Sequence, residues 1–222
     1  MSKKNIVNLI LAIVCLLILV VTSILVVNEI TLPFDNKVHD YFVSIRGEKY
    51  NFIYWFFRIL TELGNTYAVI VICLIVLILT RVDNKSLSFV IGLILLVAIS
   101  YILKDAFARI RPDLELRWMS EKSYSYPSGH SNTAGFVYSF LLYIVFNVTK
   151  NKKIRIATSI LFVSIILIVM TSRLVLAVHY FTDLVGGLSL GLLFSFLTMI
   201  VSNILITKNI LKKGIFSKKE EE

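Results

Sequence analysis

Long apolar stretches separated by short polar segments dominate the chain. The first stretch runs from Ile6 to Val27, behind Lys3 and Lys4. It is longer than the apolar core of a signal peptide, about 7–15 residues, so we expect a retained spanning helix. The same pattern of apolar runs bounded by polar residues predicts further spans, making six in all, at about 66–80, 86–108, 131–148, 154–176 and 184–206.

The segment at 28–65 is mixed in character, and aromatic residues cluster in its second half. Such rings favour the membrane–water boundary, so short interfacial helices are expected here. The predicted fold class is therefore all-α, a polytopic membrane protein with a six-transmembrane-helix bundle and short interfacial helices. We expect a single domain over residues 1–222, made of a first span with an outward interfacial segment (1–65), a motif-bearing helical core (66–206) and a basic cytoplasmic tail (207–222).

The composition agrees with a membrane protein. Of the 222 residues, 57% are hydrophobic and 17% are charged, whereas soluble domains carry roughly 45–50% apolar and 25% charged residues. The same values exclude a disordered chain. Cys15 and Cys73 both lie inside apolar runs, so neither a disulfide framework nor a zinc site is expected.

The formal net charge is +9, and its distribution predicts how the chain is oriented. No basic patch is interleaved with aromatic residues on a soluble face, so a nucleic-acid partner is not expected. Lys and Arg concentrate in the cytoplasmic loops of membrane proteins, which places both termini in the cytoplasm and the loops at 28–65, 104–130 and 171–183 outside. More than half of the 23 Lys and Arg residues lie on the side of the termini, namely Lys3, Lys4, Arg81, Lys85, Lys150, Lys152, Lys153, Arg155, Lys208, Lys212, Lys213, Lys218 and Lys219.

Polar residues gather in three blocks at the outward ends of predicted spans. The first block is Lys104-Asp-Ala-Phe-Ala-Arg-Ile-Arg111-Pro112. On a helix Lys104 and Arg111 would lie about 20° apart on one face, and Pro112 would end that helix. Two aligned cations suit an anionic group with several oxygens. The alternative is that both side chains extend to lipid headgroups.

The second block, Ser125-Tyr-Pro-Ser128-Gly129-His130, directly precedes the fourth span. Pro and Gly on either side of Ser128 place backbone N–H groups and a hydroxyl at a helix N-terminus, which favours anion binding. His130 adds a group that exchanges a proton near neutral pH. The alternative is an ordinary capping turn.

The third block is Ser172-Arg173-Leu-Val-Leu-Ala-Val-His179-Tyr-Phe-Thr-Asp183. His179 and Asp183 are four residues apart, so they share a face if this stretch is helical. A carboxylate beside an imidazole fixes its tautomer and supports the positive charge that develops when the other nitrogen attacks. The alternative is a buried His–Asp pair that serves packing alone. All three blocks together are typical of a phosphate pocket with a nucleophile and a separate general acid, without need of a metal ion.

Lys104-x6-Arg111-Pro112, Pro127-Ser128-Gly129-His130 and Ser172-Arg173-x5-His179-x3-Asp183 resemble the three signature motifs of the type 2 phosphatidic acid phosphatase (PAP2) superfamily. The motifs are complete and in order, and the resemblance covers about residues 60–206. Ala177 and Phe181 stand where relatives often carry Gly and Pro. The chain is similar to small bacterial members that dephosphorylate phosphatidylglycerol phosphate or undecaprenyl diphosphate.

The resemblance implies a metal-independent lipid phosphatase of the bacterial cell membrane, without cofactor, and the charge distribution places its active site on the outward side. Its substrate would be a lipid phosphate: phosphatidylglycerol phosphate, undecaprenyl diphosphate or phosphatidic acid. By resemblance, His179 attacks phosphorus to form a phosphohistidine, Asp183 holds its ring, and His130 protonates the leaving oxygen. The implied phosphate-binding groups are Lys104, Arg111, Ser128, Gly129 and Arg173.

Two other classes of function stay open at this point. A lipid transporter would account for six spans with internal charges, but not for motifs arranged for phosphoryl transfer. A non-catalytic lipid-phosphate-binding protein would need the cations but not the His179–Asp183 pair. The sequence predicts neither the oligomeric state nor which lipid is preferred.

Overall fold

The computed structural model describes residues 2–80 and 82–207, and these form an all-helical structure, as predicted. The chain starts with α1 (Lys3–Val27), followed by two shorter helices, α2 (Leu32–Ile45) and α3 (Phe52–Leu60). A 3₁₀ turn, η1 (Thr61–Gly64), then precedes five helices. These five are α4 (Thr66–Thr80), α5 (Asn84–Phe107), α6 (Gly129–Val148), α7 (Lys152–Val175) and α8 (Phe181–Thr207).

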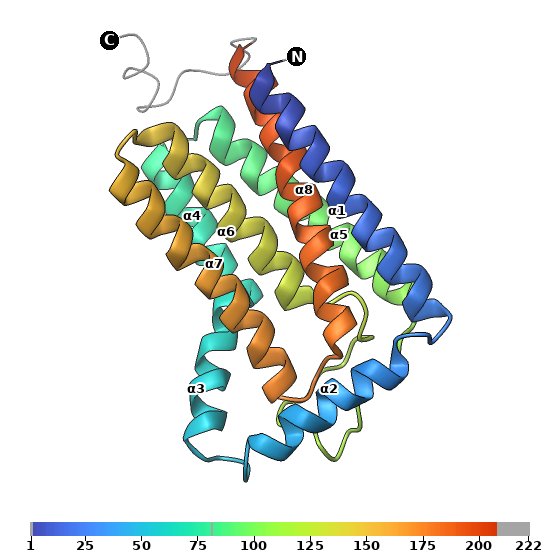
Figure 1. Ribbon diagram of the computed structural model, residues 1–222. Coiled ribbons are helices and arrows are strands. Elements are labelled where there is room, and N and C mark those ends of the chain that lie inside the picture. Colours follow the sequence, from blue (N-terminus) through green and yellow to red (C-terminus); the bar gives the residue numbers. More distant parts are fainter. Residues whose placement is uncertain (1, 81, 208–222) are drawn as a thin grey trace.

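Five of these helices, α1, α5, α6, α7 and α8, are long and apolar enough to cross a membrane (Figure 1). The predicted span at 66–80 coincides with α4, which at 15 residues is about 22 Å long, short of a hydrocarbon core of roughly 30 Å. Helix α4 is long enough to cross a membrane only if α3 and η1 are counted with it. The chain bends by 46° between the α3–η1 segment and α4. A sixth span therefore exists only as a bent one.

Short helices occupy the mixed segment at 28–65, as expected. Figure 1 shows α2 lying across the end of the bundle that is remote from the start of α1 and the end of α8. The helix is two-sided: Phe34 and Tyr41 are exposed, whereas Asp35 and His39 are buried. Burial of a carboxylate on the inner face of a surface helix requires a partner for it in the bundle.

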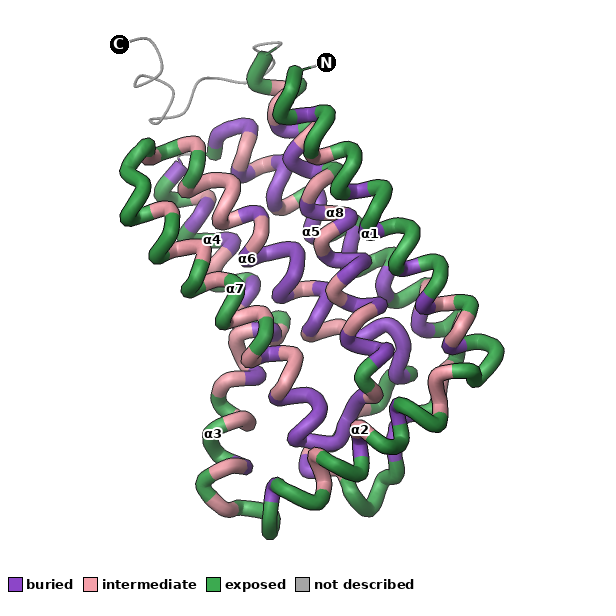
Figure 2. Tube along the Cα trace, viewed as in Figure 1, coloured by how far each residue is buried: buried purple, intermediate pink, exposed green. Residues whose placement is uncertain are grey.

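The core lies along α6 and α8, which have the largest buried shares among the long helices (Figure 2). Their backbones approach closely because α8 has Gly187 and Gly191 one turn apart. A Cβ at Gly191 would lie 2.1 Å from the carbonyl oxygen of Asn132, and one at Gly187 would lie 2.5 Å from that of Ser128. Small residues at this spacing let two membrane helices pack backbone to backbone. The contact fixes the start of α6 beside the start of α8.

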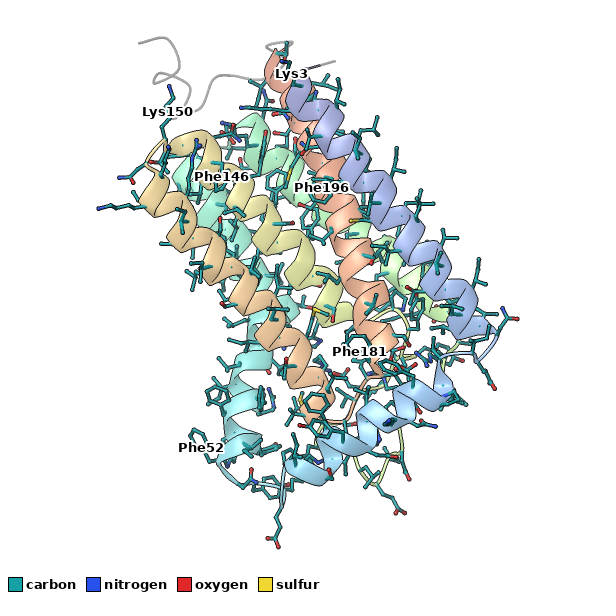
Figure 3. All side chains as sticks on the ribbon, viewed as in Figure 1. Lys3, Phe52, Phe146, Lys150, Phe181 and Phe196 are labelled. Atoms are coloured by element: carbon teal, nitrogen blue, oxygen red, sulfur yellow. The ribbon has the colours of Figure 1, made fainter. Side chains whose placement is uncertain are left out.

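Both ends of the described chain lie at the same end of the bundle (Figure 1). Lys3 and Lys150 lie at this end, and Phe181 lies toward the opposite one (Figure 3). The first motif block runs from the last turn of α5 into the following loop, the second runs from that loop into the first turn of α6, and the third joins α7 to α8. All three therefore meet at the end of the bundle that is remote from the start of α1. Arg81 and most of the predicted basic tail, residues 208–222, lie outside the described residues.

Candidate active site

The three motif blocks surround a cavity of about 220 Å³ at this end of the bundle. Three predicted residues in its wall come from the ends of helices: Lys104 from the last turn of α5, and Gly129 and His130 from the start of α6. Arg111 and His179 come from the connecting loops. The wall therefore combines two cations, two imidazoles and the start of a helix.

Three predicted residues do not line the cavity. Ser128 is fully buried and caps α6, with its Oγ accepting from the backbone N–H of Ser131 at 3.4 Å. Asp183 is also fully buried, behind His179. Arg173 lies in the last turn of α7 with no exposed surface.

The expectation that Lys104 and Arg111 share one helix face is wrong. Helix α5 ends at Phe107, because Ala108 adopts a left-handed conformation with φ of 45° and its N–H closes on the carbonyl of Lys104. The helix therefore stops before Pro112, and Arg111 lies in the loop. Lys104 still extends toward this loop and donates to the carbonyl oxygen of Tyr124 at 2.7 Å.

His179 and Asp183 are brought together as predicted, but not by a shared helix face. His179 lies in the loop before α8, and only Asp183 is in the first helical turn. The backbone at Ala177 is left-handed, with φ of 54°, which turns the chain between α7 and α8. Such a conformation favours glycine, which has no Cβ atom, so Ala177 adopts it at a cost in backbone strain.

The contacts of the His179 ring determine its tautomer. Nε2 lies 3.1 Å from Nη1 of Arg111, and Nδ1 lies 3.3 Å from Oδ2 of Asp183. An arginine N–H only donates and a carboxylate only accepts, so Nδ1 carries the proton and Nε2 holds a lone pair. Because His179 lines the cavity, the ring that carries the lone pair is part of the cavity wall.

The environment of His179 keeps its ring neutral. Burial and then the cations of Arg111 and Lys104 hold the pKa of His179 well below its usual range near 6.5. Burial lowers the pKa of Arg111 to about 10, so its guanidinium is still charged at neutral pH. A neutral imidazole next to fixed cations can act as a nucleophile toward an anion.

Arg173 connects the cavity to Glu121, a residue that sequence reasoning missed. Its Nη2 is paired with Oε1 of Glu121, and its Nη1 donates to the Thr61 hydroxyl at 3.0 Å and lies 3.5 Å from Nε2 of His130. Oε2 of Glu121 also lies 3.9 Å from Arg111, and Glu121 lines the cavity. A carboxylate thus already sits between two of the predicted phosphate-binding cations.

Three further residues support Asp183 and were also missed. Ser125 donates to its Oδ2, Arg109 donates to its Oδ1, and Asp35 of α2 binds the other side of Arg109. Ser125 and Arg109 lie within the motif blocks, but nothing in their spacing points to Asp183. Among the described residues, no group of three or more His, Cys, Asp or Glu side chains is arranged as metal ligands.

Helix ends, a neutral imidazole held by a carboxylate, and surrounding cations are the features expected of a phosphate site in a membrane helix bundle. A family model described as the PAP2 superfamily matches residues 85–206, more than half of the chain. The chain therefore belongs to the PAP2 superfamily, which confirms the resemblance.

One protein sequence and one crystal structure, both from Bacillus subtilis, are similar to the chain. Phosphatidylglycerophosphatase B of strain 168 is 40% identical over 100 residues, which span 43% of this chain and 47%, about half, of that protein. The crystal structure of a transmembrane PAP2-type phosphatidylglycerolphosphate phosphatase superposes with a TM-score of 0.74. That comparison covers 91% of this chain and 98% of the other at 24% sequence identity. At this identity the likeness confirms the predicted fold class, a helical membrane protein.

Proposed function

We propose that this protein is a lipid phosphatase that transfers a phosphoryl group to His179 and then to water. The observation that carries the proposal is the tautomer of His179, whose Nε2 lone pair belongs to a cavity wall that also holds Lys104 and Arg111. A site that only bound phosphate would need the cations, but not a buried carboxylate that supports an attacking imidazole.

In the first step, Nε2 of His179 attacks phosphorus and the bond from phosphorus to the ester oxygen breaks. Arg111 gives up its contact with Nε2 and donates to a phosphate oxygen instead, which exposes the lone pair. The positive charge that develops on the imidazole is balanced by Asp183 through Nδ1–H. Lys104, Arg111 and the Gly129 amide stabilise the phosphate oxygens, which carry the charge of the transition state.

Arg173 serves the same anion from behind the wall. Its Nε is buried without a hydrogen-bond partner among the described residues, whereas its Nη1 and Nη2 are engaged. This spare donor supports the assignment of Arg173 to phosphate binding. Ser128, by contrast, would act through the N-terminus of α6 that it caps.

His130 completes the cycle by moving a proton. It gives a proton to the leaving oxygen, then takes one from the water that attacks the phosphohistidine, so that phosphate leaves and His179 is restored. Its place in the cavity wall, near the start of α6, supports this role.

We propose phosphatidylglycerol phosphate as the preferred substrate, and the polar part of the cavity wall supports this choice. Beyond the cations, Ser100, Asn132 and Thr133 line the cavity, joined by hydrogen bonds of 2.7 Å between Asn132 and Ser100 and 3.0 Å between Thr133 and Asn132. Hydroxyl and amide groups match a glycerol headgroup, whereas an isoprenoid chain offers them no partner. The similarity to phosphatidylglycerophosphatase B supports the same substrate.

Phosphate release by the detergent-purified protein tests this function. We expect release from phosphatidylglycerol phosphate with EDTA present, faster than from phosphatidic acid or undecaprenyl diphosphate. Loss of activity with EDTA, restored by added divalent metal, would contradict metal independence. No release from any of the three lipids by a folded, monodisperse sample would contradict the phosphatase proposal and favour lipid-phosphate binding or transport.

The proposal includes an active site on the outer face of the cell membrane, with both termini in the cytoplasm. The basic residues Lys3 and Lys150 lie at the end of the bundle that is remote from the cavity (Figure 3). By the positive-inside rule, this basic end faces the cytoplasm, so the cavity faces outward.

Cysteine labelling in intact cells tests this orientation. With Cys15 and Cys73 replaced by serine, a membrane-impermeant maleimide is expected to label Glu48→Cys, in the loop between α2 and α3, but not Lys150→Cys. Both native side chains are exposed, so each position is accessible on its own side of the membrane. The reverse labelling pattern would place the active site in the cytoplasm.

A further inference from the structure

A buried arginine between two buried carboxylates connects α2 to the start of α8. Nη1 of Arg109 donates to Oδ1 of Asp183 at 2.6 Å, and Nη2 donates to Oδ2 of Asp35 at 2.8 Å. Both carboxylates are fully buried. Phe34 of α2 also packs edge-on against Phe181, with ring centroids 5.7 Å apart. Helix α2 is therefore joined to the site by both polar and apolar contacts.

Asp35 additionally caps α8 from outside that helix. Its Oδ1 accepts from the backbone N–H of Thr182 at 3.0 Å, and its Oδ2 accepts from the Thr182 hydroxyl at 2.6 Å. Arg109 lies over the ring of Tyr180, 4.6 Å from its centroid. The N–H groups in the first turn of a helix lack partners within the helix, so this contact sets where α8 begins.

The two oxygens of Asp183 consequently have separate tasks. Arg109 occupies Oδ1, while Oδ2 faces Nδ1 of His179 at 3.3 Å and also accepts from the backbone N–H of Tyr180 at 2.9 Å. We propose that Arg109 is a positioning residue for the reaction and that Asp35, alone among the described polar side chains of α2, fixes it in place. This inference rests on the proposed function, because it takes His179 as the nucleophile.

Arg109 also has an electrostatic role that simple packing would not require. Burial opposes its charge, but the carboxylates of Asp183 and Asp35 outweigh this and raise the pKa of Arg109. It neutralises part of the negative charge of Asp183, and its own cation lowers the pKa of His179. The other ionisable groups around His179 come from every surrounding element: Lys104, Arg111, Glu121, His130, Arg173 and Asp183.

Replacing Arg109 and replacing Asp35 should therefore shift the pKa of His179 in opposite directions. Arg109→Gln removes a cation, so the pKa of His179 rises and the acid limb of kcat/KM moves to higher pH. Asp35→Asn removes an anion, so this limb moves to lower pH. The expected shifts are roughly half to one pH unit. Loss of packing would lower activity in both variants without this reversal of sign.

The experiment measures the pH profile of kcat/KM for the full chain and, independently, the pKa of His179 by NMR of protein labelled with [¹³C]histidine. The chain has only three histidines, so His179→Ala identifies the relevant signal. We expect Arg109→Gln and Asp35→Asn to lower kcat roughly 10–100-fold with little change in KM, as loss of a partner that orients a metal-bound histidine does. Arg109→Lys, which keeps the charge, should keep the pKa of His179 near its wild-type value.

Two control variants on α2 remove the same charges from exposed side chains: Asp40→Asn removes one negative charge, as Asp35→Asn does, and Lys37→Gln removes one positive charge, as Arg109→Gln does. Asp40→Asn and Lys37→Gln should leave kcat and the pKa of His179 unchanged. If Arg109→Gln does not fold, Asp35→Asn still gives the direction of its own shift, and Arg109→Lys still serves as the reference that keeps the charge. Wild-type kcat or an unmoved His179 signal in folded Arg109→Gln or Asp35→Asn would overturn the inference while leaving the phosphatase proposal intact. An inactive wild type would instead overturn the proposed function.

Discussion

Replacing His179 with alanine is expected to lower kcat for phosphate release by about a thousandfold or more. The variant loses the only atom proposed to bond to phosphorus, while the cations that line the cavity are kept. Its KM should change less than its kcat, because Lys104 and Arg111 still bind the phosphate. Phosphate release from phosphatidylglycerol phosphate, in detergent and with EDTA, is the measurement.

His39 provides the matched control for this variant. It is also a buried histidine, but it lies on α2 outside the cavity, so His39→Gln should retain wild-type activity. Trapping adds a direct test: protein incubated with lipid labelled at the terminal phosphate and quenched in alkali should carry the label on wild type and not on His179→Ala. More than a few per cent of wild-type activity, or label on the variant, would show that another residue is the nucleophile.

Alanine at Gly191 is expected to disrupt the contact between α6 and α8. Its Cβ would meet the backbone of Asn132 at 2.1 Å, and a backbone cannot move aside as the end of a flexible side chain can. The helices must separate, at a cost of about 1–3 kcal/mol or more in the free energy of unfolding. Activity should fall as well, because α6 begins with Gly129 and His130. Thermal unfolding in detergent, followed by intrinsic fluorescence, measures the first effect.

Gly129→Ala is the control for stability. A Cβ at Gly129 would have no atom within 4 Å, so the unfolding temperature should match that of the wild type. An unfolding temperature for Gly191→Ala equal to that of Gly129→Ala would show that the packing of α6 against α8 tolerates a methyl group.

Apolar runs predicted most of the fold, because a spanning helix must satisfy its own backbone hydrogen bonds and its length is set by the bilayer. They did not predict the bend before α4, since the polar residues between α3 and α4 mark a break but carry no information about the angle between the two helices. The three blocks met at one end of the bundle, as expected. Lys104 nevertheless reaches the cavity from a helix and Arg111 from a loop, because the left-handed conformation of Ala108 ends α5 between them. This turn could not be predicted, since no glycine stands at the position.

Long-range partners could not be predicted from spacing. Asp35 and Arg109 are 74 residues apart, and no periodicity relates a residue on a surface helix to one in a distant loop. Glu121 was missed for a related reason, since it lies in an irregular loop and meets Arg173 only through the tertiary structure. The available signal was chemical: a carboxylate in a chain with few charges needs a cation if it becomes buried.

The packing of α1 against α8 has a consequence for how the protein is made. These two helices lie side by side (Figure 1), and the amide of Asn203 donates to that of Asn5 at 2.8 Å. About 150 residues separate the end of α1 from the start of α8, which a ribosome translating about 5–20 residues per second takes on the order of ten seconds to add. During that time α1 lies in the lipid bilayer without the contact to α8. Asp183 arrives only with α8, so the nascent chain has no complete phosphate site until that helix has been inserted.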